Sequence, residues 1–412
     1  MADNSLSPHG GKIVERVLEP AQAKDKIKGL TQIPIRAQLA RECLGIAYGF
    51  FSPLEGFMSK ADVDSVVKNM TLASGYVWSI PLVFDMSDAE IQEIGLKEGD
   101  TLLLTYQDNP LATLEVEEIY SYDKDFMAQN VYGTTEDKHP GVKRTRAYKD
   151  KFIGGKVTVV NPPTINPPFD KFWYPPRKLR ESFSARGWKK VVAHQTRNVP
   201  HAGHEWLMKG AWFSANADAI LVNPVIGEKR TGDYIDEAII LTHDALRTAG
   251  YFREDIHMTS LLLWDMRYAG PREAVFHAIV RKNLGCTHHM FGRDHAGVGT
   301  YYDTYAAHRI FTQLPDLGIY PVKTLEWWYC PECAGIAYEE LCGHKKQSQG
   351  FSGSLIRSII EDGVKPPRLI FRPEVFDIVM DCAEKYGNGS PFVTEAYLKR
   401  GDPVMTVPPM KV

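Results

Sequence analysis

Residues 189–213 read KKVVAHQTRNVPHAGHEWLMKGAWF, an apolar run followed directly by a helical pattern. The run at 189–193 is typical of a buried strand, and we expect a helix over residues 200–213. The same alternation continues along the chain. Further strands are expected at residues 219–222, 256–264, 288–291 and 319–325, and a further helix at 271–284. Strands that alternate with helices predict a parallel, doubly wound α/β sheet.

The chain changes character at residues 161–168, which read NPPTINPP. Proline fits neither a helix interior nor a central strand, so this segment is interpreted as a linker. Short apolar runs separated by polar turns precede it, for example at residues 76–84 and 101–106. This pattern predicts a β-rich, barrel-like first domain with a few helices.

The composition is typical of a globular protein. The chain has 412 residues, of which 44% are hydrophobic and 24% charged, and its net charge is −3. Two or three domains are expected, and no basic field would draw the protein to nucleic acid or an anionic membrane. No uncharged apolar stretch approaches the roughly 20 residues that span a bilayer. The start of the chain lacks the pattern of a signal peptide, so a cytoplasmic protein is expected.

The segment at residues 194–205 carries the clearest chemistry, because ligands of a doubly wound sheet bind beyond the carboxyl ends of its strands. Asn198 suits a helix N-cap and Pro200 suits the first helical turn, which predicts backbone N–H groups free to bind an anion. His201 and His204 lie three residues apart and therefore share one helix face. Both imidazoles could donate to phosphate oxygens and stabilise charge that develops in a transition state.

Arg197 lies just before these histidines, and its planar guanidinium can grip a tetrahedral oxyanion with two hydrogen bonds. The two histidines alone would fit a simple helix cap or a metal site equally well. The polar side chains of Gln195, Thr196 and Asn198 around Arg197 favour the anion site.

A second candidate segment, GRDHAG at residues 292–297, follows the expected strand at 288–291. Its glycines allow a ligand to approach the backbone, Arg293 supplies a fixed positive charge, and Asp294 can orient either neighbour. Taken alone, the segment is also compatible with a surface turn that holds an incidental ion pair.

Three of the six cysteines are clustered, in the pattern C-P-E-C followed by C-G-H. Two cysteines spaced C-x-x-C form half of a tetrahedral site, and a cysteine and a histidine can complete it. Such a site has no open position, so zinc in a structural role is predicted, with free cysteines in a loop as the alternative. The expected ligands are Cys330, Cys333, Cys342 and His344. The scattered cysteines, Cys43, Cys286 and Cys382, are expected to be free thiols.

Residues 195–204 resemble the nucleotide- and sulfate-binding signature of the ATP sulfurylases, and residues 292–297 are similar to a second motif of that family. The His-x-Gly-His part alone resembles the wider nucleotidyltransferase superfamily. Other stretches similar to the family lie at residues 49–58, 132–135, 139–142, 266–274 and 351–357. The cysteine cluster resembles that of prokaryotic and archaeal members without the kinase-like extension of fungal ones. Val322 departs from many relatives, which have an aromatic residue there that is linked to sensing ATP.

The resemblance implies three parts of the chain. Residues 1–165 would form a β-rich PUA-like domain, residues 166–326 a Rossmann-like nucleotidyltransferase domain, and residues 327–412 a zinc-binding and helical subdomain. It also implies a homodimer with no nucleic-acid or membrane partner.

The reaction implied by the resemblance joins ATP and sulfate into adenosine 5′-phosphosulfate and pyrophosphate, reversibly, by in-line attack of sulfate on the α-phosphorus. It would serve sulfate assimilation, sulfate reduction or sulfur oxidation. The implied catalytic residues are Thr196, Arg197, Asn198, His201 and His204. The implied sulfate-binding residues are Gln195, Arg197 and Ala296. The implied ATP-binding residues are Gln195, Thr196, Arg197, Asn198, Gly292, Arg293, Asp294, His295 and Leu325. Mg²⁺ would accompany ATP, and cobalt could replace zinc.

Two other functions were weighed against this one. Another His-x-Gly-His adenylyltransferase would act on a phosphorylated metabolite, but Arg197 beside Gln195 suits one small oxyanion better. An RNA-binding protein would need a basic stripe, which the net charge of −3 does not favour.

Overall fold

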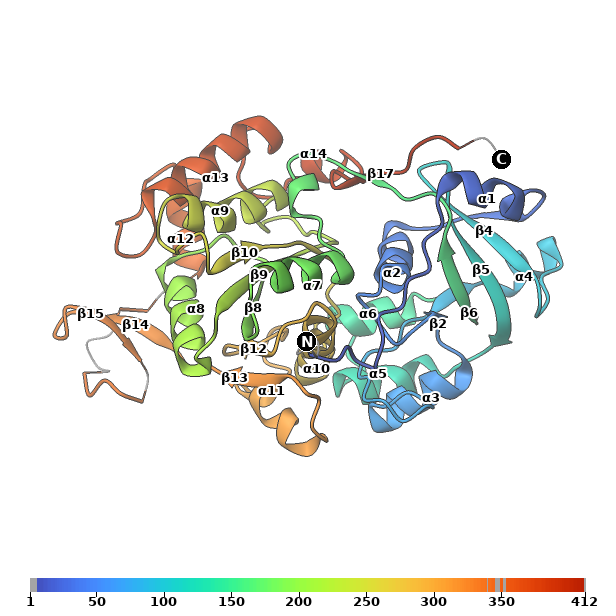
Figure 1. The fold of residues 1–412 in the computed structure, drawn as a ribbon, viewed down its shortest axis with the longest axis horizontal. Helices are drawn as coiled ribbons and strands as arrows, with labels where there is room; N and C mark the ends of the chain where they lie inside the picture. The colour runs from blue at the N-terminus through green and yellow to red at the C-terminus, as the bar shows by residue number, and fades with distance from the viewer. Residues whose placement is uncertain (1–5, 339, 345–348, 351–352, 411–412) are drawn as a thin grey trace.

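The computed structural model describes residues 6–338, 340–344, 349–350 and 353–410, and Figure 1 shows its ribbon. The N-terminal part is built on one six-stranded mixed sheet of order β1-β4-β5-β6-β2, with β3 paired to β6. Its strands are β1 (Thr31–Pro34), β2 (Gly56–Phe57), β3 (Phe84–Met86), β4 (Thr101–Tyr106), β5 (Asn109–Tyr120) and β6 (Lys151–Val159). Its helices are α1 (Pro20–Ile27), α2 (Ala37–Ala47), α3 (Lys60–Asn69), α4 (Asp88–Ile94), α5 (Lys124–Tyr132) and α6 (Pro140–Arg146). The expectation of a β-rich first part is confirmed.

The apolar run at residues 76–84 was expected to be a strand, and this expectation is wrong for most of the run. Only its last residue, Phe84, lies in a strand, and Val77 makes a single bridge to Thr71. Tyr76 is exposed, and residues 77–83 are buried but irregular. Pro81 has no N–H to give to a ladder, and the carbonyl of Val77 accepts from His9 Nε2 at 2.7 Å instead. The run is apolar because it lies in the core, not because it pairs with a neighbouring strand.

The central part of the chain forms a parallel sheet of order β10-β9-β8-β12-β13, and β11 adds to β9. Its strands are β8 (Val191–Thr196), β9 (Ala219–Ile226), β10 (His257–Thr259), β11 (Leu262–Leu263), β12 (His288–Phe291) and β13 (Tyr320–Lys323). The expected strand at 256–264 is split into two, because the Leu261 N–H donates to Phe172 O rather than to the sheet.

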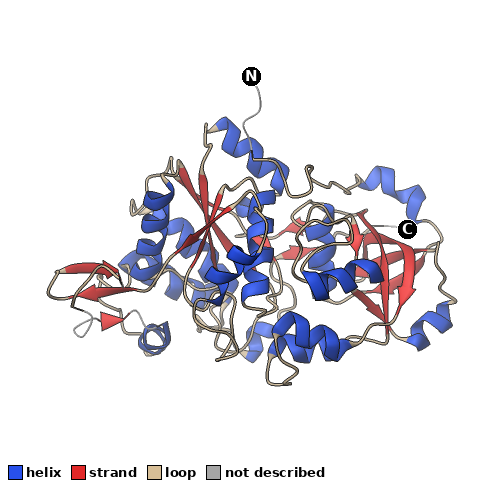
Figure 2. Cartoon of the chain, turned by 90° about the horizontal axis from the view of Figure 1, so that it is seen from below, coloured by secondary structure: helices blue, strands red, loops and turns tan. Residues whose placement is uncertain are grey.

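Successive residues of β8 face two different apolar cores. Val191 and Ala193 pack with α7 and α10, whereas Val192 packs with α8, α9 and α13. The helices around this sheet are η1 (Asp170–Phe172), α7 (Pro176–Ala185), α8 (Ala202–Ala215), α9 (Asp236–Thr248), α10 (Pro271–Asn283), α11 (Ala306–Arg309), η2 (Ile310–Gln313) and α13 (Pro373–Tyr386). Figure 2 shows helices on both sides of the strands. The sheet is therefore doubly wound, as predicted.

The C-terminal part begins with a small antiparallel sheet of order β15-β14-β16. Its strands are β14 (Trp327–Cys330), β15 (Gly335–Tyr338) and β16 (Gln349–Gly350), and the elements that follow, apart from α13, are α12 (Gly353–Glu361), α14 (Glu395–Leu398) and β17 (Met405–Thr406). β17 pairs with β7 (Thr164–Ile165) in a separate two-stranded sheet, and the side chain of Gln107 bonds to the backbone of Met405 and Val407, so the end of the chain returns to the N-terminal part. Across the described ranges, no helix combines the length and the apolar character needed to cross a bilayer.

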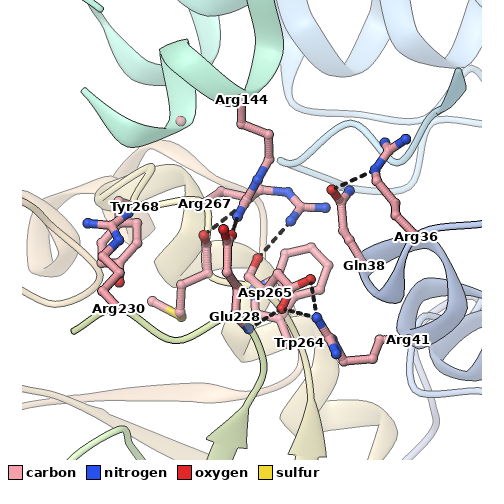
Figure 3. A network of polar contacts seen from close by, with 12 residues as sticks. Arg36, Gln38, Arg41, Arg144, Glu228, Arg230, Trp264, Asp265, Arg267 and Tyr268 are labelled. Carbon is pink, nitrogen blue, oxygen red and sulfur yellow. Dashed lines mark hydrogen bonds and ion pairs between the residues drawn. The ribbon is translucent and has the colours of Figure 1, made fainter. Parts of the chain in front are cut away.

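A buried polar network joins the N-terminal part to the parallel sheet (Figure 3). Arg267 pairs with Glu42 of α2, and both side chains are 2% exposed. Arg41 of α2 reaches Asp265 at 3.0 Å and Asp402 at 3.4 Å. Removing one partner of a buried ion pair costs about 3–5 kcal/mol, because the other charge stays in the core. This network therefore fixes how the N-terminal part sits beside the site described next.

Candidate active site

The two candidate segments meet at the carboxyl end of the parallel sheet. β8 pairs with β9 on one side and with β12 on the other. The chain leaves β8 toward β9 and returns to β12 only later, so the winding direction reverses between these strands. Such a reversal opens a crevice beyond the carboxyl ends. Residues 195–198 end β8 and residues 292–296 follow β12, so the structure brings the two segments to the carboxyl ends of two paired strands, where such a crevice is expected.

The turn after β8 is held from three directions. Thr196 Oγ1 accepts from the Asn198 N–H and donates to the Asn198 carbonyl, both at 3.1 Å. Asn198 Oδ1 accepts from Arg357 Nη2 of α12 at 2.8 Å. The Asn198 carbonyl also accepts from His243 Nε2 of α9 at 3.0 Å. The backbone that carries Arg197 is therefore fixed before any ligand arrives.

The predicted N-cap at Asn198 is wrong. α8 starts at Ala202, and its N-cap is His201, whose Nδ1 accepts from the Gly203 N–H at 3.1 Å. His204 Nδ1 accepts from the His201 N–H at 3.3 Å, which completes a reciprocal capping box. Asn198 cannot serve as the cap because its side chain is committed to Arg357, four residues before the helix begins.

These hydrogen bonds decide where the histidine protons lie. A ring nitrogen that accepts from a backbone N–H carries no proton, so a neutral His201 or His204 has its proton on Nε2. Burial lowers the pKa of His204 to about 4 and holds the pKa of His201 well below its ordinary value. The two ring centroids are 3.9 Å apart. The helix start thus holds two adjacent imidazoles, each of which carries its proton on Nε2 when neutral.

Arg197 lies at the edge of the crevice with part of its guanidinium engaged. Nη2 contacts Asp233 Oδ2 at 3.3 Å and the Glu228 carbonyl at 3.1 Å, while Nη1 donates to the Tyr268 hydroxyl. Gln195 Oε1 is buried and has no hydrogen-bond partner in the described part of the chain. An unpartnered buried amide oxygen is costly, and a bound ligand or water would satisfy it.

The loop after β12 bends through two residues in the left-handed region, Asp294 with φ 51° and Ala296 with φ 55°. The Gly297 N–H donates to the Asp294 carbonyl at 3.1 Å, and the Gly270 N–H donates to the Ala296 carbonyl at 3.0 Å. Arg293 is about half exposed and pairs with Asp294 at 3.1 Å and Glu326 at 3.2 Å. The loop is consequently tied to the start of α10, with its one arginine facing solvent.

The remaining candidate residues lie after β13. The Leu325 N–H donates to the Tyr338 hydroxyl at 3.3 Å, which links the end of the sheet to β15. Val322 is in β13 and packs against the core that contains α8. In the similar stretch at residues 351–357, Phe351 and Ser352 lie outside the described residues.

Sequence reasoning missed several residues of the crevice, including His243, Asp233 and the individual roles of Tyr268 and Arg357. Tyr268 and Arg357 lie in stretches similar to the family, which was the available signal. Arg230 was also missed. Its guanidinium lies 4.7 Å from the centre of the Tyr268 ring that Arg197 also faces, as Figure 3 shows in part.

The cysteine cluster has the geometry of a metal site. The ligand atoms of Cys330, Cys333, Cys342 and His344 all lie within 4.8 Å of one another, and no other such group was found among the described residues. The Cys333 and Cys342 sulfurs are 3.8 Å apart. Zn–S bonds of about 2.3 Å in a tetrahedron place sulfurs about 3.8 Å apart. The donor set and its spacing therefore fit zinc.

The aromatic residues next to this cluster pack against neighbouring structure. Trp328 is 3% exposed and forms a small core with Cys330 and Ala337. Trp327 stacks on Trp206 of α8, with ring centroids 6.4 Å apart. The cluster is thereby attached to the helix whose first turn carries His201 and His204.

Comparison with known proteins extends over most of the chain. The PUA-like domain profile matches residues 6–162, and the ATP-sulfurylase profile matches residues 170–382. The sulfate adenylyltransferase of Archaeoglobus fulgidus is 42% identical, over 95% of this chain and 94% of that protein. The sulfate adenylyltransferase of Hyperthermus butylicus is also 42% identical, over 90% and 95%. A solved structure, the hexameric APS kinase from Thiobacillus denitrificans, has a TM-score of 0.71 at 21% identity and covers 91% of this chain and 68% of its own, which shows a shared fold. The chain therefore belongs to the ATP-sulfurylase family.

Proposed function

We propose that this protein transfers the adenylyl group of ATP to sulfate, forming adenosine 5′-phosphosulfate and releasing pyrophosphate, and that it catalyses the reverse reaction as well. The observation that carries the proposal is the position of Gln195, Arg197, His201 and His204 on one segment at the carboxyl end of β8, beside the loop that follows β12. Sulfate adenylyltransferases at 42% identity over most of the chain support it.

The proposed sulfate site uses Arg197, Gln195 and the Ala296 N–H. The buried Gln195 amide and the guanidinium lie on the same turn, and Ala296 comes from the loop after β12. Asp233 holds Arg197 at 3.3 Å, so the fork is oriented before sulfate binds. A planar guanidinium donates two parallel hydrogen bonds, which suits a tetrahedral anion.

In the proposed reaction a sulfate oxygen attacks the α-phosphorus. The new S–O–P bond forms as the bond from the α-phosphorus to the bridging oxygen of pyrophosphate breaks, and both electrons leave with pyrophosphate. Sulfate is already an anion at neutral pH, so no general base is required. The work of the protein is to position two mutually repelling anions and to stabilise the leaving group. His201 and His204 would donate from Nε2 to the departing pyrophosphate.

The nucleotide would be held by the other candidate residues. Thr196 and Asn198 would contact ATP at the turn after β8. The loop after β12 would complete the site through Gly292, Arg293, Asp294 and His295, with Leu325 near the base. Mg²⁺ would enter with ATP and neutralise its phosphates.

The experiment that tests this function measures pyrophosphate release from ATP and Mg²⁺ with and without sulfate. We expect release to require sulfate, and molybdate to support continuous formation of AMP because its mixed anhydride hydrolyses. Release that is equal without sulfate, or that requires a phosphorylated metabolite instead, would overturn the proposal.

We further propose that the cysteine cluster binds one structural zinc ion, with cobalt as an alternative, and takes no part in the chemistry. The domain limits proposed are residues 1–165, 166–326 and 327–412. A cytoplasmic homodimer is proposed as the working form. Metal analysis and light scattering on the purified protein test the metal and the dimer.

A further inference from the structure

A buried carboxylate stands behind the nucleotide loop. Glu273 lies in the first turn of α10 and is fully buried. Its Oε1 accepts from Trp264 Nε1 and from the Arg267 N–H, both at 2.9 Å, and its Oε2 accepts from the Ala269 N–H at 3.1 Å. Burial alone would raise the pKa of Glu273, but its contact with His277 and its hydrogen bonds from Arg267 and Trp264 outweigh that effect and hold the pKa at about 2. Glu273 is therefore a carboxylate at neutral pH.

His277, one helical turn later and also fully buried, connects this carboxylate to the loop. Its Nε2 lies 3.6 Å from Glu273 Oε1, and its Nδ1 lies 3.1 Å from His295 Nε2. At 3.6 Å this contact is longer than a hydrogen bond, and His277 Nε2 has no hydrogen-bond partner among the described residues, but the carboxylate attracts a protonated Nε2 and would repel a lone pair there. In a neutral His277 the Nδ1 atom is consequently an acceptor, and His295 Nε2 must be the donor.

We propose that Glu273 and His277 are positioning residues that fix the proton of His295 on Nε2, so that His295 presents Nδ1 to the nucleotide as a hydrogen-bond acceptor. This inference rests on the proposed function, because the nucleotide site after β12 is itself part of that proposal. His295 Nδ1 would accept a hydrogen bond from a donor group of the nucleoside, either a ribose hydroxyl or the adenine amino group. It would not bind the phosphates.

The surroundings of His295 favour one fixed orientation. Its ring makes edge contacts with Phe291 at 4.9 Å and with His289 at 5.8 Å between centroids. Glu273 organises the backbone before α10 through its own hydrogen bonds from the Arg267 and Ala269 N–H groups, and His277 also favours its charged form. The backbone before α10 therefore does not need the contact between His277 and His295. The effect that remains for this contact is the orientation of His295.

The proton position can be read directly by nitrogen NMR on the full-length protein labelled with ¹⁵N-histidine, with the His295 signals assigned by their loss in His295→Asn. We expect the Nε2–H form in the wild type, the same form in His277→Gln, and a mixed or Nδ1–H form in His277→Phe. Glutamine can accept from His295 and donate to Glu273, whereas phenylalanine can do neither. An Nδ1–H form in the wild type, or an unchanged form in His277→Phe, would overturn the proposal. If His277→Phe does not fold, His277→Leu, which also can neither accept nor donate a hydrogen bond, takes its place with the same expected outcome.

Kinetics provide a second, separate test. Loss of one hydrogen bond is worth about 1.4 kcal/mol, so His277→Phe should raise KM for ATP about tenfold, with little change in kcat or in KM for sulfate. His277→Gln should stay close to the wild type. The matched control is His257→Phe, another fully buried histidine, on the edge strand β10. A selective loss of kcat, or an equal effect in the control, would contradict the positioning role.

Analogues identify the donor, since 2′-deoxy-ATP and 3′-deoxy-ATP lack one hydroxyl each and ITP lacks the amino group. The analogue that lacks the group bound by His295 should have the same KM with the wild type as with His277→Phe. If His277→Phe raises the KM of all three analogues as much as it raises the KM of ATP, His295 does not accept from the nucleoside. A wild type without sulfate-dependent turnover would refute the proposed function, while the NMR result would still report on the His295 proton.

Discussion

The crevice at the end of β8 and the cysteine cluster after β13 both gather histidine, but they use its ring nitrogens in opposite ways. His201 and His204 give Nδ1 to backbone N–H groups of α8 and keep an N–H on Nε2. His344 turns Nδ1 toward two sulfurs, at 3.5 Å from Cys333 and 3.7 Å from Cys342. The first arrangement would suit an anion as ligand, and the second would suit a cation. The backbone contacts of a histidine, rather than its spacing in the sequence, decide between the two.

The two regions also differ in what surrounds their charges. Backbone N–H groups of Cys333 and His344 point at the sulfurs of Cys330 and Cys342, at 3.5 and 3.4 Å, a pattern that would stabilise thiolates bound to a metal. In the crevice, Gln195 Oε1 has no partner within the described residues. A closed metal site should govern stability alone, whereas an open crevice should govern turnover. Substitutions in each region can test this separation.

The largest effect is expected from Arg197→Ala. Losing a charge-assisted, two-pronged contact to sulfate should reduce sulfate-dependent turnover about 100-fold or more. Arg197→Lys should also be poor, because an ammonium lacks the planar fork. Steady-state kinetics with varied sulfate measure the loss, and thermal unfolding should remain near that of the wild type. The control is Arg253→Ala, an exposed arginine paired with Asp255. A lysine variant with near-normal kinetics would show that Arg197 does not grip sulfate.

A smaller loss is expected from His204→Ala. A hydrogen bond to a charged group is worth about 2 kcal/mol, which corresponds to about 30-fold in kcat. The loss should fall on kcat rather than on KM for ATP, since charge on the leaving pyrophosphate grows only in the transition state. His288→Ala, at the amino end of β12, serves as the control. An unchanged kcat with a raised KM would assign His204 to ground-state binding.

Local sequence rules predicted the sheet because its strands depend on local apolarity. Val191, Val192 and Ala193 are buried on both faces, and a continuous apolar run is typical of such strands. α9 (Asp236–Thr248) was not predicted, because the ion pairs of its first turn come from residues outside the helix. Asp236 pairs with Lys229 at 2.7 Å, and Glu237 pairs with Arg400 of the C-terminal part at 2.7 Å. No local sequence pattern predicts such ion-pair partners.

The same distinction applies to the crevice. The residues of 195–204 could be proposed from a single continuous stretch, but the groups that orient them come from other elements. Arg357 reaches Asn198 from 159 positions away, and His243 from 45 positions away. These contacts also explain the wrong N-cap, since Asn198 is a good cap only while its side chain is free. The local preference of Asn198 for an N-cap position gave a wrong prediction, because a tertiary hydrogen bond from Arg357 uses the side-chain oxygen that would cap the helix.

For the cysteine cluster we expect Cys333→Ser to lower stability and metal content together. Part of the metal affinity is local folding energy, so the loss should be about 2 kcal/mol, or about 4 °C in Tm. Turnover per folded molecule should be retained. Metal analysis and calorimetry measure the effect, with Cys382→Ser, a buried thiol outside the cluster, as the control for metal content. Wild-type protein purified without zinc or cobalt, or a Cys333→Ser variant that loses kcat but not stability, would contradict the separation.

The smallest effect concerns pH and belongs to the histidines of the crevice. Burial lowers the pKa of His243 to about 3, whereas an unfolded histidine titrates near 6.5. Between these values the unfolded chain binds the proton and the folded protein does not, so the free energy of unfolding falls as the pH drops below about 6.5. From pH 7 to pH 5.5 one such histidine should contribute a loss of about 1 kcal/mol.

In His243→Gln this contribution disappears, while glutamine can still donate to the Asn198 carbonyl. Denaturant unfolding across this pH range should therefore give a shallower slope for His243→Gln than for the wild type. The same reduction should appear when both proteins carry Cys333→Ser, because the slope originates in the crevice and not at the metal. Identical slopes with and without His243 would mean that this imidazole can be protonated inside the folded protein, and that the crevice is less closed to solvent than its burial indicates.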